Sequence, residues 1–212
     1  MKDIAKQIES LGVVPVVAIE DAKDAASLGE ALIAGGLPCA EITFRTAAAE
    51  AAIKRIAQQN PDMLLGAGTI LTVSQAQKAV AAGAKFIVTP GFDEAVVDWC
   101  LANQIPITPG VATPTEINMA LNKGIGVLKF FPAEALGGVK MLKAIGGPYR
   151  DVKFIPTGGI NSDNFADYLA LPQVLACGGS WLVKKQTISA GKFETITTLA
   201  QEARQIVASV RS

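Results

Sequence analysis

A lysine inside an apolar segment is the residue of this sequence best suited to covalent chemistry. Lys129 lies in the run Gly-Val-Leu-Lys-Phe-Phe-Pro-Ala-Glu at residues 126–134, which is typical of a buried strand. Burial disfavours the charged form of an amine, and an uncharged amine attacks carbonyl carbon in the first step of Schiff-base catalysis. The alternative is a lysine at a strand end whose ammonium group reaches solvent. The segment alone leaves both interpretations open.

A carboxylate followed four residues later by an arginine is the second candidate. In the segment Cys-Ala-Glu-Ile-Thr-Phe-Arg-Thr, the two-residue period of a strand puts Glu41, Thr43 and Arg45 on one face. If the apolar face packs against helices, the carboxylate faces an interior where it needs a partner or a function. Glu41 is then either a general base beside Arg45, whose guanidinium fits a substrate carboxylate, or half of a structural ion pair with Arg45.

The absence of histidine from all 212 residues removes several kinds of catalytic site. Ser-His-Asp and Cys-His nucleophile systems are excluded, as are zinc sites with three histidines or with two histidines and a glutamate. Proton transfer must therefore fall to a carboxylate, a lysine, a tyrosine or water. We expect no metal and no other cofactor.

The charge balance and the cysteines indicate which partners and which cellular compartment to expect. The 19 basic and 19 acidic residues cancel, and there is no basic patch to favour nucleic acid or a membrane surface. The polar start is no signal peptide, and no apolar run approaches the ~18 residues of a membrane span. The three cysteines are far apart in the sequence and odd in number, which indicates free thiols in a reducing, cytoplasmic compartment.

Short β-branched runs alternate with alanine-rich segments, the pattern of a parallel sheet built from βα units. We expect strands at 13–19, 39–43, 63–66, 86–89, 105–108, 127–130, 153–155 and 174–177. We expect helices at about 21–34, 46–59, 74–82, 94–103, 114–122, 139–145, 164–171 and 193–210. Eight units favour a single α/β domain over 1–212, a (β/α)8 barrel with an extra N-terminal helix. An open, doubly wound sheet is the alternative.

Small, glycine-rich turns follow several of these strands, where a barrel carries its catalytic groups. Thr69 ends the Gly-Ala-Gly-Thr segment after the third strand, and Pro90 lies in the turn after the fourth. The seventh strand leads into Pro-Thr-Gly-Gly-Ile-Asn at 156–161, and the eighth into Gly-Gly-Ser at 178–180. Loops after strands seven and eight hold a phosphate in many barrels. Neither loop contains lysine or arginine, so backbone amides must carry most of the recognition; ordinary turns are the alternative.

Taken together, these motifs resemble one known family along nearly the whole chain. The segments are Val-Pro-Val-Val at 14–17, Glu-Ile-Thr-Phe-Arg-Thr at 41–46, Gly-Ala-Gly-Thr at 66–69, Lys-Phe-Phe-Pro-Ala-Glu at 129–134, Pro-Thr-Gly-Gly-Ile at 156–160 and Gly-Gly-Ser-Trp-Leu at 178–182. They are similar to those of the 2-keto-3-deoxy-6-phosphogluconate (KDPG) aldolases, also described as 4-hydroxy-2-oxoglutarate (KHG) aldolases. The resemblance implies a metal-free class I aldolase on a (β/α)8 barrel, which is usually a homotrimer.

Residue roles carried over from the resemblance give a complete expected site. Lys129 is expected to form the Schiff base and Glu41 to shuttle protons. The expected substrate-binding residues are Arg45 and Thr69 for the carboxylate, Pro90 and Phe131 as pocket walls, Thr157 for the choice of sugar acid, and Gly158, Gly159, Gly179 and Ser180 for the phosphate. Related phosphogalactonate aldolases typically carry an aliphatic residue in place of Thr157, so this threonine favours the gluconate substrate.

The implied reaction splits KDPG into pyruvate and glyceraldehyde 3-phosphate, and KHG into pyruvate and glyoxylate. Some members of the family carry a basic residue near the first strand, where this chain has Ala-Ile-Glu-Asp at 18–21, so a less electropositive phosphate site is expected. Two alternatives remain from the residues. One is a metal-free phosphosugar isomerase or epimerase with Glu41 as its base, and the other is a phosphosugar-binding barrel without catalysis.

Overall fold

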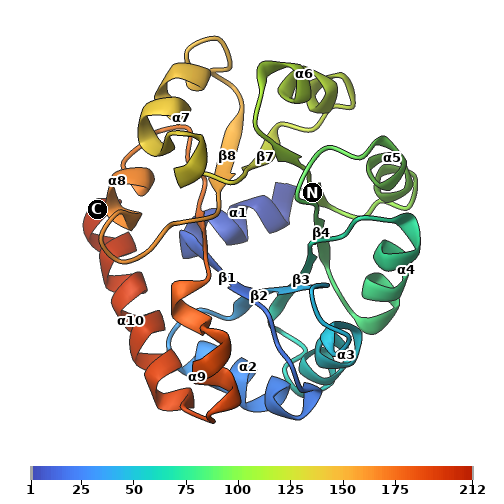
Figure 1. Cartoon of the computed structure of the whole chain (residues 1–212), viewed down its shortest axis with the longest axis vertical. Helices are drawn as coiled ribbons and strands as arrows, with labels where there is room; N and C mark the ends of the chain where they lie inside the picture. Colours follow the sequence, from blue (N-terminus) through green and yellow to red (C-terminus); the bar gives the residue numbers. More distant parts are fainter. Residues whose placement is uncertain (1, 212) are drawn as a thin grey trace.

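The computed structural model describes residues 2–211, which form a ring of strands surrounded by helices (Figure 1). The strands are β1 (Val13–Val17), β2 (Cys39–Thr43), β3 (Leu64–Gly68), β4 (Phe86–Val88), β5 (Ile107–Thr108), β6 (Gly110–Val111), β7 (Val127–Phe130), β8 (Lys153–Pro156) and β9 (Cys177–Gly179). The helices are α1 (Lys2–Leu11), α2 (Ala25–Ala34), α3 (Ala49–Gln59), α4 (Val73–Ala82), α5 (Glu94–Ala102), α6 (Pro114–Asn122), α7 (Gly138–Gly146), α8 (Phe165–Leu169), α9 (Lys185–Ser189) and α10 (Phe193–Val210). Three short 3₁₀ turns are η1 (Ala22–Asp24), η2 (Glu134–Leu136) and η3 (Trp181–Val183).

The strands pair in parallel and close on themselves. One sheet has the order β5-β4-β3-β2-β1-β9 and the other β6-β7-β8. Parallel bridges from Phe154 to Val174 and from Thr157 to Gly178 connect β8 to the segment around β9. The predicted (β/α)8 barrel is therefore confirmed, and the open doubly wound sheet is wrong.

The fifth predicted strand, at 105–108, is observed as the shorter β5, and an additional fragment, β6, follows it beyond Pro109. Proline has no backbone N–H to give to a ladder, but its carbonyl accepts a hydrogen bond from the backbone N–H of Lys129 at 2.9 Å. This bond lies between the two strand fragments and keeps the wall of the barrel continuous.

Other element boundaries differ from those predicted. The eighth predicted strand, at 174–177, is shifted to β9, because the register of β9 with β1 pairs Val13 with Cys177 and Pro15 with Gly179. Asp21 does act as a cap, but its side chain accepts a hydrogen bond from the Lys23 N–H and so begins η1. The helix α2 starts only after this turn.

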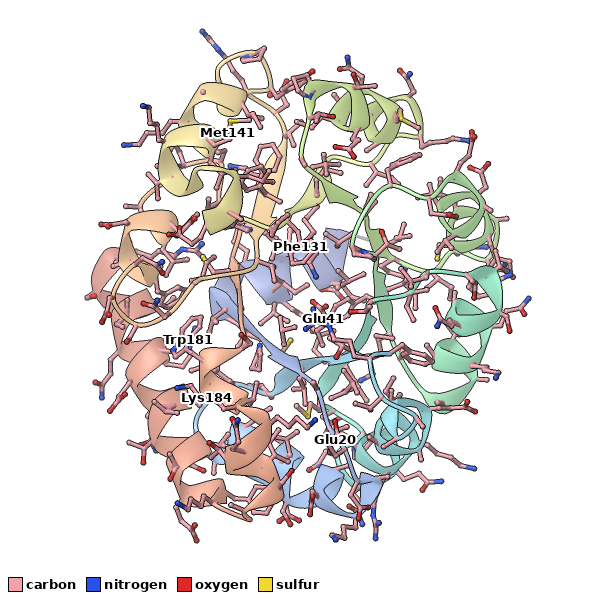
Figure 2. All side chains as sticks on the ribbon, viewed as in Figure 1. Glu20, Glu41, Phe131, Met141, Trp181 and Lys184 are labelled. Atoms are coloured by element: carbon pink, nitrogen blue, oxygen red, sulfur yellow. The ribbon has the colours of Figure 1, made fainter. Side chains whose placement is uncertain are left out.

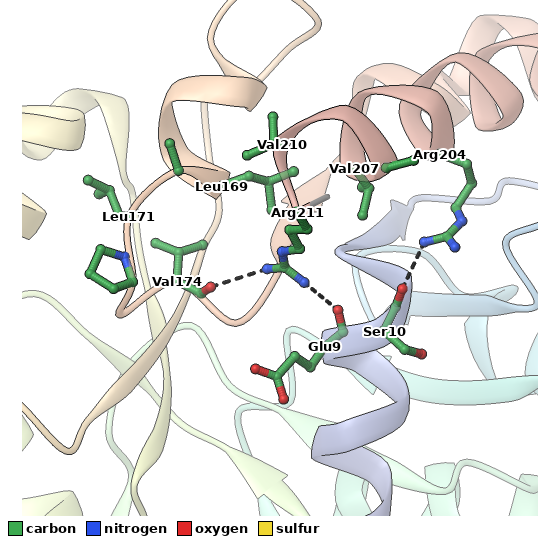
Figure 3. Close-up of a pocket in the computed structure, with 12 residues that line it drawn as sticks. Glu9, Ser10, Leu169, Leu171, Val174, Arg204, Val207, Val210 and Arg211 are labelled. Atoms are coloured by element: carbon green, nitrogen blue, oxygen red, sulfur yellow. Dashed lines mark hydrogen bonds between the residues drawn. The ribbon is translucent and has the colours of Figure 1, made fainter.

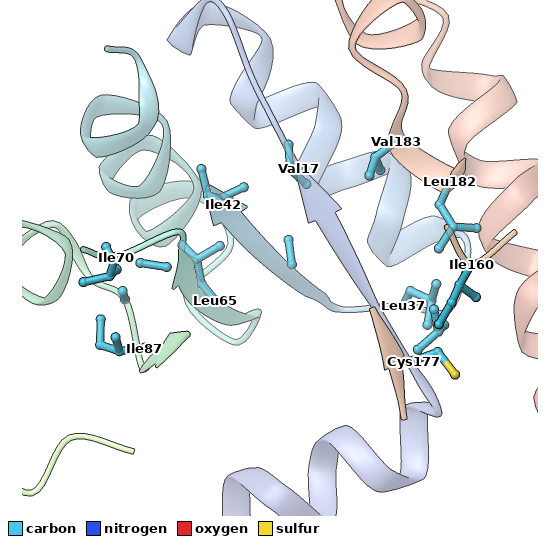
Figure 4. Close-up of a cluster of buried hydrophobic side chains, with 14 of the residues drawn as sticks. Val17, Leu37, Ile42, Leu65, Ile70, Ile87, Ile160, Cys177, Leu182 and Val183 are labelled. Carbon is cyan, nitrogen blue, oxygen red and sulfur yellow. The ribbon is translucent and has the colours of Figure 1, made fainter. Parts of the chain in front are cut away.

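Alternation along the strands separates an outer core from the barrel interior. Val17, Ile42, Leu65 and Ile87 belong to the outer core, between the strands and the helices (Figure 4). A smaller inner cluster includes Ile8 of α1, so this helix closes the N-terminal end of the barrel. The polar side chains of β2 are left to face the interior.

Two arginines join the chain's last helix to its first. Arg204 donates to the carbonyls of Ser10 and Leu11, and Arg211 donates to those of Glu9, Val174 and Leu175 (Figure 3). They line a cavity of about 500 Å³ whose other walls come from α10 and the segment after α8. Because carbonyls at the end of α1 occupy both guanidinium groups, this cavity is a structural junction.

Within residues 2–211, no helix is both long and apolar enough to cross a bilayer.

Candidate active site

Lys129 lies on the face of β7 that is turned to the barrel interior. Its neighbours Leu128 and Phe130 are fully buried in the outer core, as the two-residue period requires. Only 3% of the lysine is exposed, so its ammonium end does not reach solvent and the buried interpretation is correct. The Nζ atom lies 5.3 Å from the centroid of the Phe131 ring, within range of a cation–π contact.

Glu41 reaches Lys129 from β2, on the other side of the barrel. The lysine Nζ donates to the carboxylate Oε1 at 3.3 Å, and both side chains are about 95% buried. Glu41 is labelled near the centre of the ring in Figure 2, with Phe131 close by. The pair is neutral as a whole, and this compensation is what allows two ionisable groups to share the interior. Glu41 pairs with Lys129 and not with Arg45, so the alternative of a structural ion pair between Glu41 and Arg45 is wrong.

Gly68 on β3 makes the space that the Glu41 carboxylate occupies. A Cβ atom at this position would lie 2.0 Å from the Glu41 Oε1, far inside any van der Waals contact. The register places Glu41 beside Gly66 and Thr43 beside Gly68, so the carboxylate leans over the neighbouring strand. Gly68, the second glycine of the Gly-Ala-Gly-Thr segment, therefore leaves room for the Glu41 carboxylate. From the sequence alone, this segment was interpreted as a small, tight turn.

Arg45 and Thr69 come together at the ends of β2 and β3. The arginine Nε donates to the threonine Oγ1 at 3.3 Å. Arg45 is exposed and Thr69 half-buried, and Thr69 has a φ of 57°. A β-branched residue rarely adopts this left-handed conformation, and such strain is concentrated at functional sites. The structure thus brings together the two residues expected to bind a carboxylate.

Thr157 follows β8 and belongs to the same interior. It is 5% exposed, and a Cβ on Gly178 would lie 2.2 Å from its Oγ1. With Glu41 and Lys129 it lines a cavity of about 10 Å³ that is floored by apolar side chains, including Ile8 of α1. This volume is sufficient for about one water molecule.

Pro90 and Phe131 follow β4 and β7 on the same end of the barrel. The turn at Pro90 is held by Thr89, whose hydroxyl donates to the Gly91 carbonyl at 2.6 Å. Gly110 packs so closely that a Cβ there would lie 2.2 Å from the Pro90 carbonyl oxygen. Phe131 contacts Lys129 directly, whereas the position of Pro90 follows only from its turn.

Gly158 and Gly159 form a tight loop after β8. Both have positive φ, 99° and 83°, which glycine adopts without strain. The Gly158 carbonyl accepts from the Glu134 N–H at 3.1 Å, and the Gly159 carbonyl accepts from the Asn164 side chain at 3.2 Å. With both carbonyls engaged, the conformation of this loop is fixed.

Gly179 ends β9, and Ser180 follows it and faces a cavity at the rim. Gly179 packs against Trp181, because a Cβ would lie 2.3 Å from the indole ring. Ser180 lines a cavity of about 210 Å³ at the rim. The remaining lining residues are Val16, Val17, Ala18, Thr43, Arg45, Val183, Lys184, Lys185 and Gln186.

Sequence reasoning missed two groups of residues beside these loops. The Tyr168 hydroxyl donates a short hydrogen bond to Glu134 Oε1, against the glycine loop. Lys184 and Lys185 line the rim cavity. The only available signal was position, since both lysines closely follow a glycine-rich loop after a strand.

The described residues contain no cluster of three or more His, Cys, Asp or Glu side chains that could hold a metal ion. The side chains that meet in the interior are an amine and a carboxylate, with the Thr157 hydroxyl beside them. A buried amine beside a carboxylate can attack a carbonyl compound while the carboxylate exchanges its proton.

Comparison with protein families gives one match over most of the chain. The model described as "KDPG and KHG aldolase" matches residues 4–199. This span contains every residue of the candidate site.

Similar proteins agree in sequence and in structure. The chain is 54% identical to a 2-dehydro-3-deoxy-phosphogluconate aldolase of Treponema pallidum, covering 98% of this chain and 99% of that protein. It is 44% identical to the KHG/KDPG aldolase of Escherichia coli, covering 95% of each. A crystal structure of the KDPG aldolase of Legionella pneumophila, with pyruvate captured as a covalent carbinolamine intermediate, matches with a TM-score of 0.91 and 42% identity. That match covers 94% of this chain and 97% of the other.

Proposed function

This chain belongs to the family of KDPG and KHG aldolases, and from that premise we propose that it cleaves KDPG into pyruvate and glyceraldehyde 3-phosphate through a Schiff base on Lys129. The observation that carries the proposal is the buried pair in which Lys129 Nζ and Glu41 Oε1 lie 3.3 Å apart. A nucleophilic amine and a proton acceptor at this separation are the two groups that a class I aldolase needs.

Proton exchange within the pair starts the reaction. Lys129 must lose a proton to become a nucleophile, and Glu41 is within hydrogen-bonding distance to take it. The free amine attacks the C2 carbonyl of the substrate, and Glu41 returns protons as the carbinolamine loses water. The resulting iminium ion withdraws electrons from the C3–C4 bond.

Cleavage requires the proton of the C4 hydroxyl to leave. Glu41 accepts it, directly or through one water molecule, as the C3–C4 bond breaks and glyceraldehyde 3-phosphate departs. The small cavity shared by Glu41, Lys129 and Thr157 is wide enough for such a water. The remaining enamine is protonated at C3, and hydrolysis of the iminium releases pyruvate and the free lysine.

The ends of the substrate are bound by the surrounding rim. Arg45 and Thr69 bind the carboxylate next to C2, with the guanidinium as the cationic donor. Phe131 and Pro90 form walls beside the reacting carbons, and Thr157 contacts the sugar acid between them. The backbone of Gly158, Gly159 and Gly179, with the Ser180 hydroxyl, binds the phosphate.

The same site also accepts KHG, which it cleaves to pyruvate and glyoxylate. The pyruvate half of KHG presents the same carboxylate and carbonyl to Arg45 and Lys129. The Escherichia coli relative, 44% identical to this chain, carries both names, KHG and KDPG.

The iminium ion is the electron sink of this mechanism, so no metal or other cofactor takes part. We expect dialysis against EDTA to leave the turnover of KDPG unchanged. A loss of activity that added divalent cation restores contradicts this part of the proposal.

Incubation with pyruvate and borohydride, followed by mass spectrometry of the peptides, tests the central step. We expect a reduced pyruvyl adduct on Lys129 in the wild-type protein and no adduct in Lys129→Ala. An adduct on another lysine would assign the Schiff base to that lysine and contradict the role of Lys129. A folded protein that gives none with saturating pyruvate favours an isomerase or a non-catalytic phosphosugar-binding barrel.

We also propose that the chain forms one domain over 1–212 and works in the cytoplasm as a homotrimer. The three cysteines are free and buried, in keeping with a reducing compartment, and the trimer follows from the family resemblance. Light scattering during size exclusion should give three times the chain mass of 22.0 kDa. The mass of a single chain contradicts the trimer.

A further inference from the structure

The phosphate loops of this barrel lack a cation of their own. Gly158, Gly159, Gly179 and Ser180 offer backbone N–H groups and one hydroxyl. An acid lies against one of these loops, because a Cβ on Gly159 would lie 2.6 Å from the Glu134 side chain. A phosphate monoester carries close to two negative charges at neutral pH, so positive charge from elsewhere would strengthen its binding.

Positive charge gathers in the rim cavity that Ser180 shares. Arg45, Lys184 and Lys185 line this space of about 210 Å³, and no acidic residue does. Ala18, at the end of β1, contributes only a methyl group to the wall and so leaves the space open. An anion at Ser180 can therefore extend into a space bounded by cations from two separate parts of the chain.

The three cations are not equally available. Arg45 bonds Thr69 through its Nε, and the proposed function assigns it to the carboxylate at the other end of the substrate. Lys185 is paired with Glu20, with its Nζ 2.6 Å from the carboxylate. Lys184 has no acidic partner among residues 2–211, so its charge is uncompensated. In Figure 2, Lys184 and Trp181 are labelled next to each other and Glu20 farther along, all in the lower half of the view.

The segment that carries Lys184 is firmly anchored. Leu182 and Val183 are buried, and the Trp181 ring lies 5.3 Å from that of Phe165. The Lys184 carbonyl accepts hydrogen bonds from the N–H groups of Thr187 and Ile188. The backbone under the lysine is thus fixed, and only its flexible side chain has to move towards a ligand.

We propose that Lys184 is the cation that binds the phosphate of the substrate in this rim cavity, while the ion pair with Glu20 holds Lys185 out of that role. The proposal rests on the proposed function for the identity of the substrate. It assigns Lys184 to the phosphate ester alone, in a cavity that Lys129 does not line.

Steady-state kinetics with two substrates test this assignment. For Lys184→Ala we expect the KM for KDPG to rise about 10- to 100-fold with little change in kcat, the range of a lost charge-assisted hydrogen bond. The KM for the same acid without its phosphate, 2-keto-3-deoxygluconate, should stay within about threefold. Lys184→Arg should restore most of the loss, because it retains the charge. An equal KM change for both substrates, or none, overturns the proposal.

The neighbouring lysine provides a matched control. Lys185→Ala removes the same charge one residue away, and we expect the KM for KDPG to change less than about threefold. Glu20→Gln should release Lys185 and tighten the binding of KDPG by about threefold. A Lys185→Ala effect as large as that of Lys184→Ala contradicts the assignment.

Binding of inorganic phosphate separates this proposal from the proposed function. Titration calorimetry with inorganic phosphate needs no turnover, and we expect Lys184→Ala to weaken its affinity about 10-fold and Lys185→Ala to leave it nearly unchanged. If borohydride trapping fails while this difference holds, the aldolase proposal fails and the anion site stands. If trapping succeeds and the difference is absent, only the role of Lys184 is refuted.

Discussion

At the scale of single residues, the site depends on two buried groups that compensate each other. Lys129 and Glu41 come from opposite sides of the barrel and lie 88 positions apart in the sequence. Loss of one partner from a buried ion pair typically costs about 3–5 kcal/mol, because the other charge is left uncompensated. A substitution at either position can therefore lower stability as well as activity, and the two effects have to be measured separately.

The substitution Glu41→Gln keeps the size of the side chain and removes its ability to accept a proton. We expect imine formation with pyruvate to continue in part, while kcat for KDPG falls about 10²- to 10⁴-fold, the usual worth of general acid–base catalysis. Initial-rate assays measure kcat for KDPG, and borohydride trapping measures imine formation with pyruvate. Glu50→Gln, on the exposed face of α3, serves as the control. Turnover of Glu41→Gln within a few-fold of wild type contradicts the assigned role.

The substitution Gly68→Ala tests the position of the carboxylate without changing an ionisable group. The added methyl group would lie 2.0 Å from Glu41 Oε1, so the carboxylate must move away from Lys129. We expect kcat/KM for KDPG to fall about 100-fold, within the range for a lost proton-transfer group. Gly126→Ala adds the same methyl group where no atom lies within 4 Å, and it should retain activity. Equal activities of the two variants show that Glu41 tolerates displacement.

At the scale of elements, the loop after β8 is held by its neighbours in the barrel. The backbone N–H groups of Ala133 and Glu134 donate to the carbonyls of Thr157 and Gly158. Tyr168, fully buried on α8, donates to the Glu134 carboxylate. Burial, with the Glu134 contact second, raises the pKa of the Tyr168 hydroxyl well above its usual range, so it stays a donor at all ordinary pH values.

Tyr168 is for this reason a positioning residue for the phosphate loop. In Tyr168→Phe we expect the KM for KDPG to rise about 3- to 10-fold and the unfolding free energy to fall by about 1 kcal/mol, as for one lost hydrogen bond. Imine formation with pyruvate should not change.

Tyr149→Phe separates this role from a purely structural one. The Tyr149 hydroxyl donates to Asn118 and to the Pro114 carbonyl, both on α6. Its loss should lower stability to a similar degree without raising the KM for KDPG. A rise in KM for both variants, or for neither, contradicts the positioning role. Chemical denaturation and initial-rate kinetics provide the two measurements.

At the scale of the whole molecule, the three thiols report on the integrity of the core. Cys39, Cys100 and Cys177 are all fully buried. Burial raises the pKa of Cys100 from 9.0 to about 11. It raises that of Cys39 further, with a second contribution from the Glu41 carboxylate.

Alkaline pH should therefore weaken the fold. The thiols of the unfolded chain ionise above pH 9.0, whereas the Cys100 thiol of the folded chain stays protonated until about pH 11. The unfolded state binds fewer protons over this interval, so the unfolding free energy should fall as pH rises from 9 to 11. Denaturant titrations across this range measure the fall. At pH 8, iodoacetamide should label none of the three thiols in the folded protein and all three in denaturant; labelling of the folded protein contradicts the buried arrangement.

Much of the barrel and of the site follows from local patterns in the sequence. Eight βα units were recognisable because strands buried on both faces form continuous apolar runs. Lys129 and Glu41 stood out because ionisable residues in such runs are costly unless they have a partner or a function. Arg45 was singled out because the strand period puts it on the same face as Glu41. Thr69 and the glycine loops were singled out because catalytic groups of a barrel gather at the ends of its strands. Their expected binding roles came from the family resemblance.

The tertiary structure alone decided which of these groups meet. Local pattern allowed Glu41 to pair with Arg45, four residues away, but curvature of the sheet brings it to Lys129 across the barrel. The same closure places Lys184 beside Ser180 and Arg45, and Tyr168 beside Glu134. A sequence specifies the face on which a side chain lies through its local period. Contacts between segments far apart depend on how the whole sheet twists and closes, which no single segment encodes.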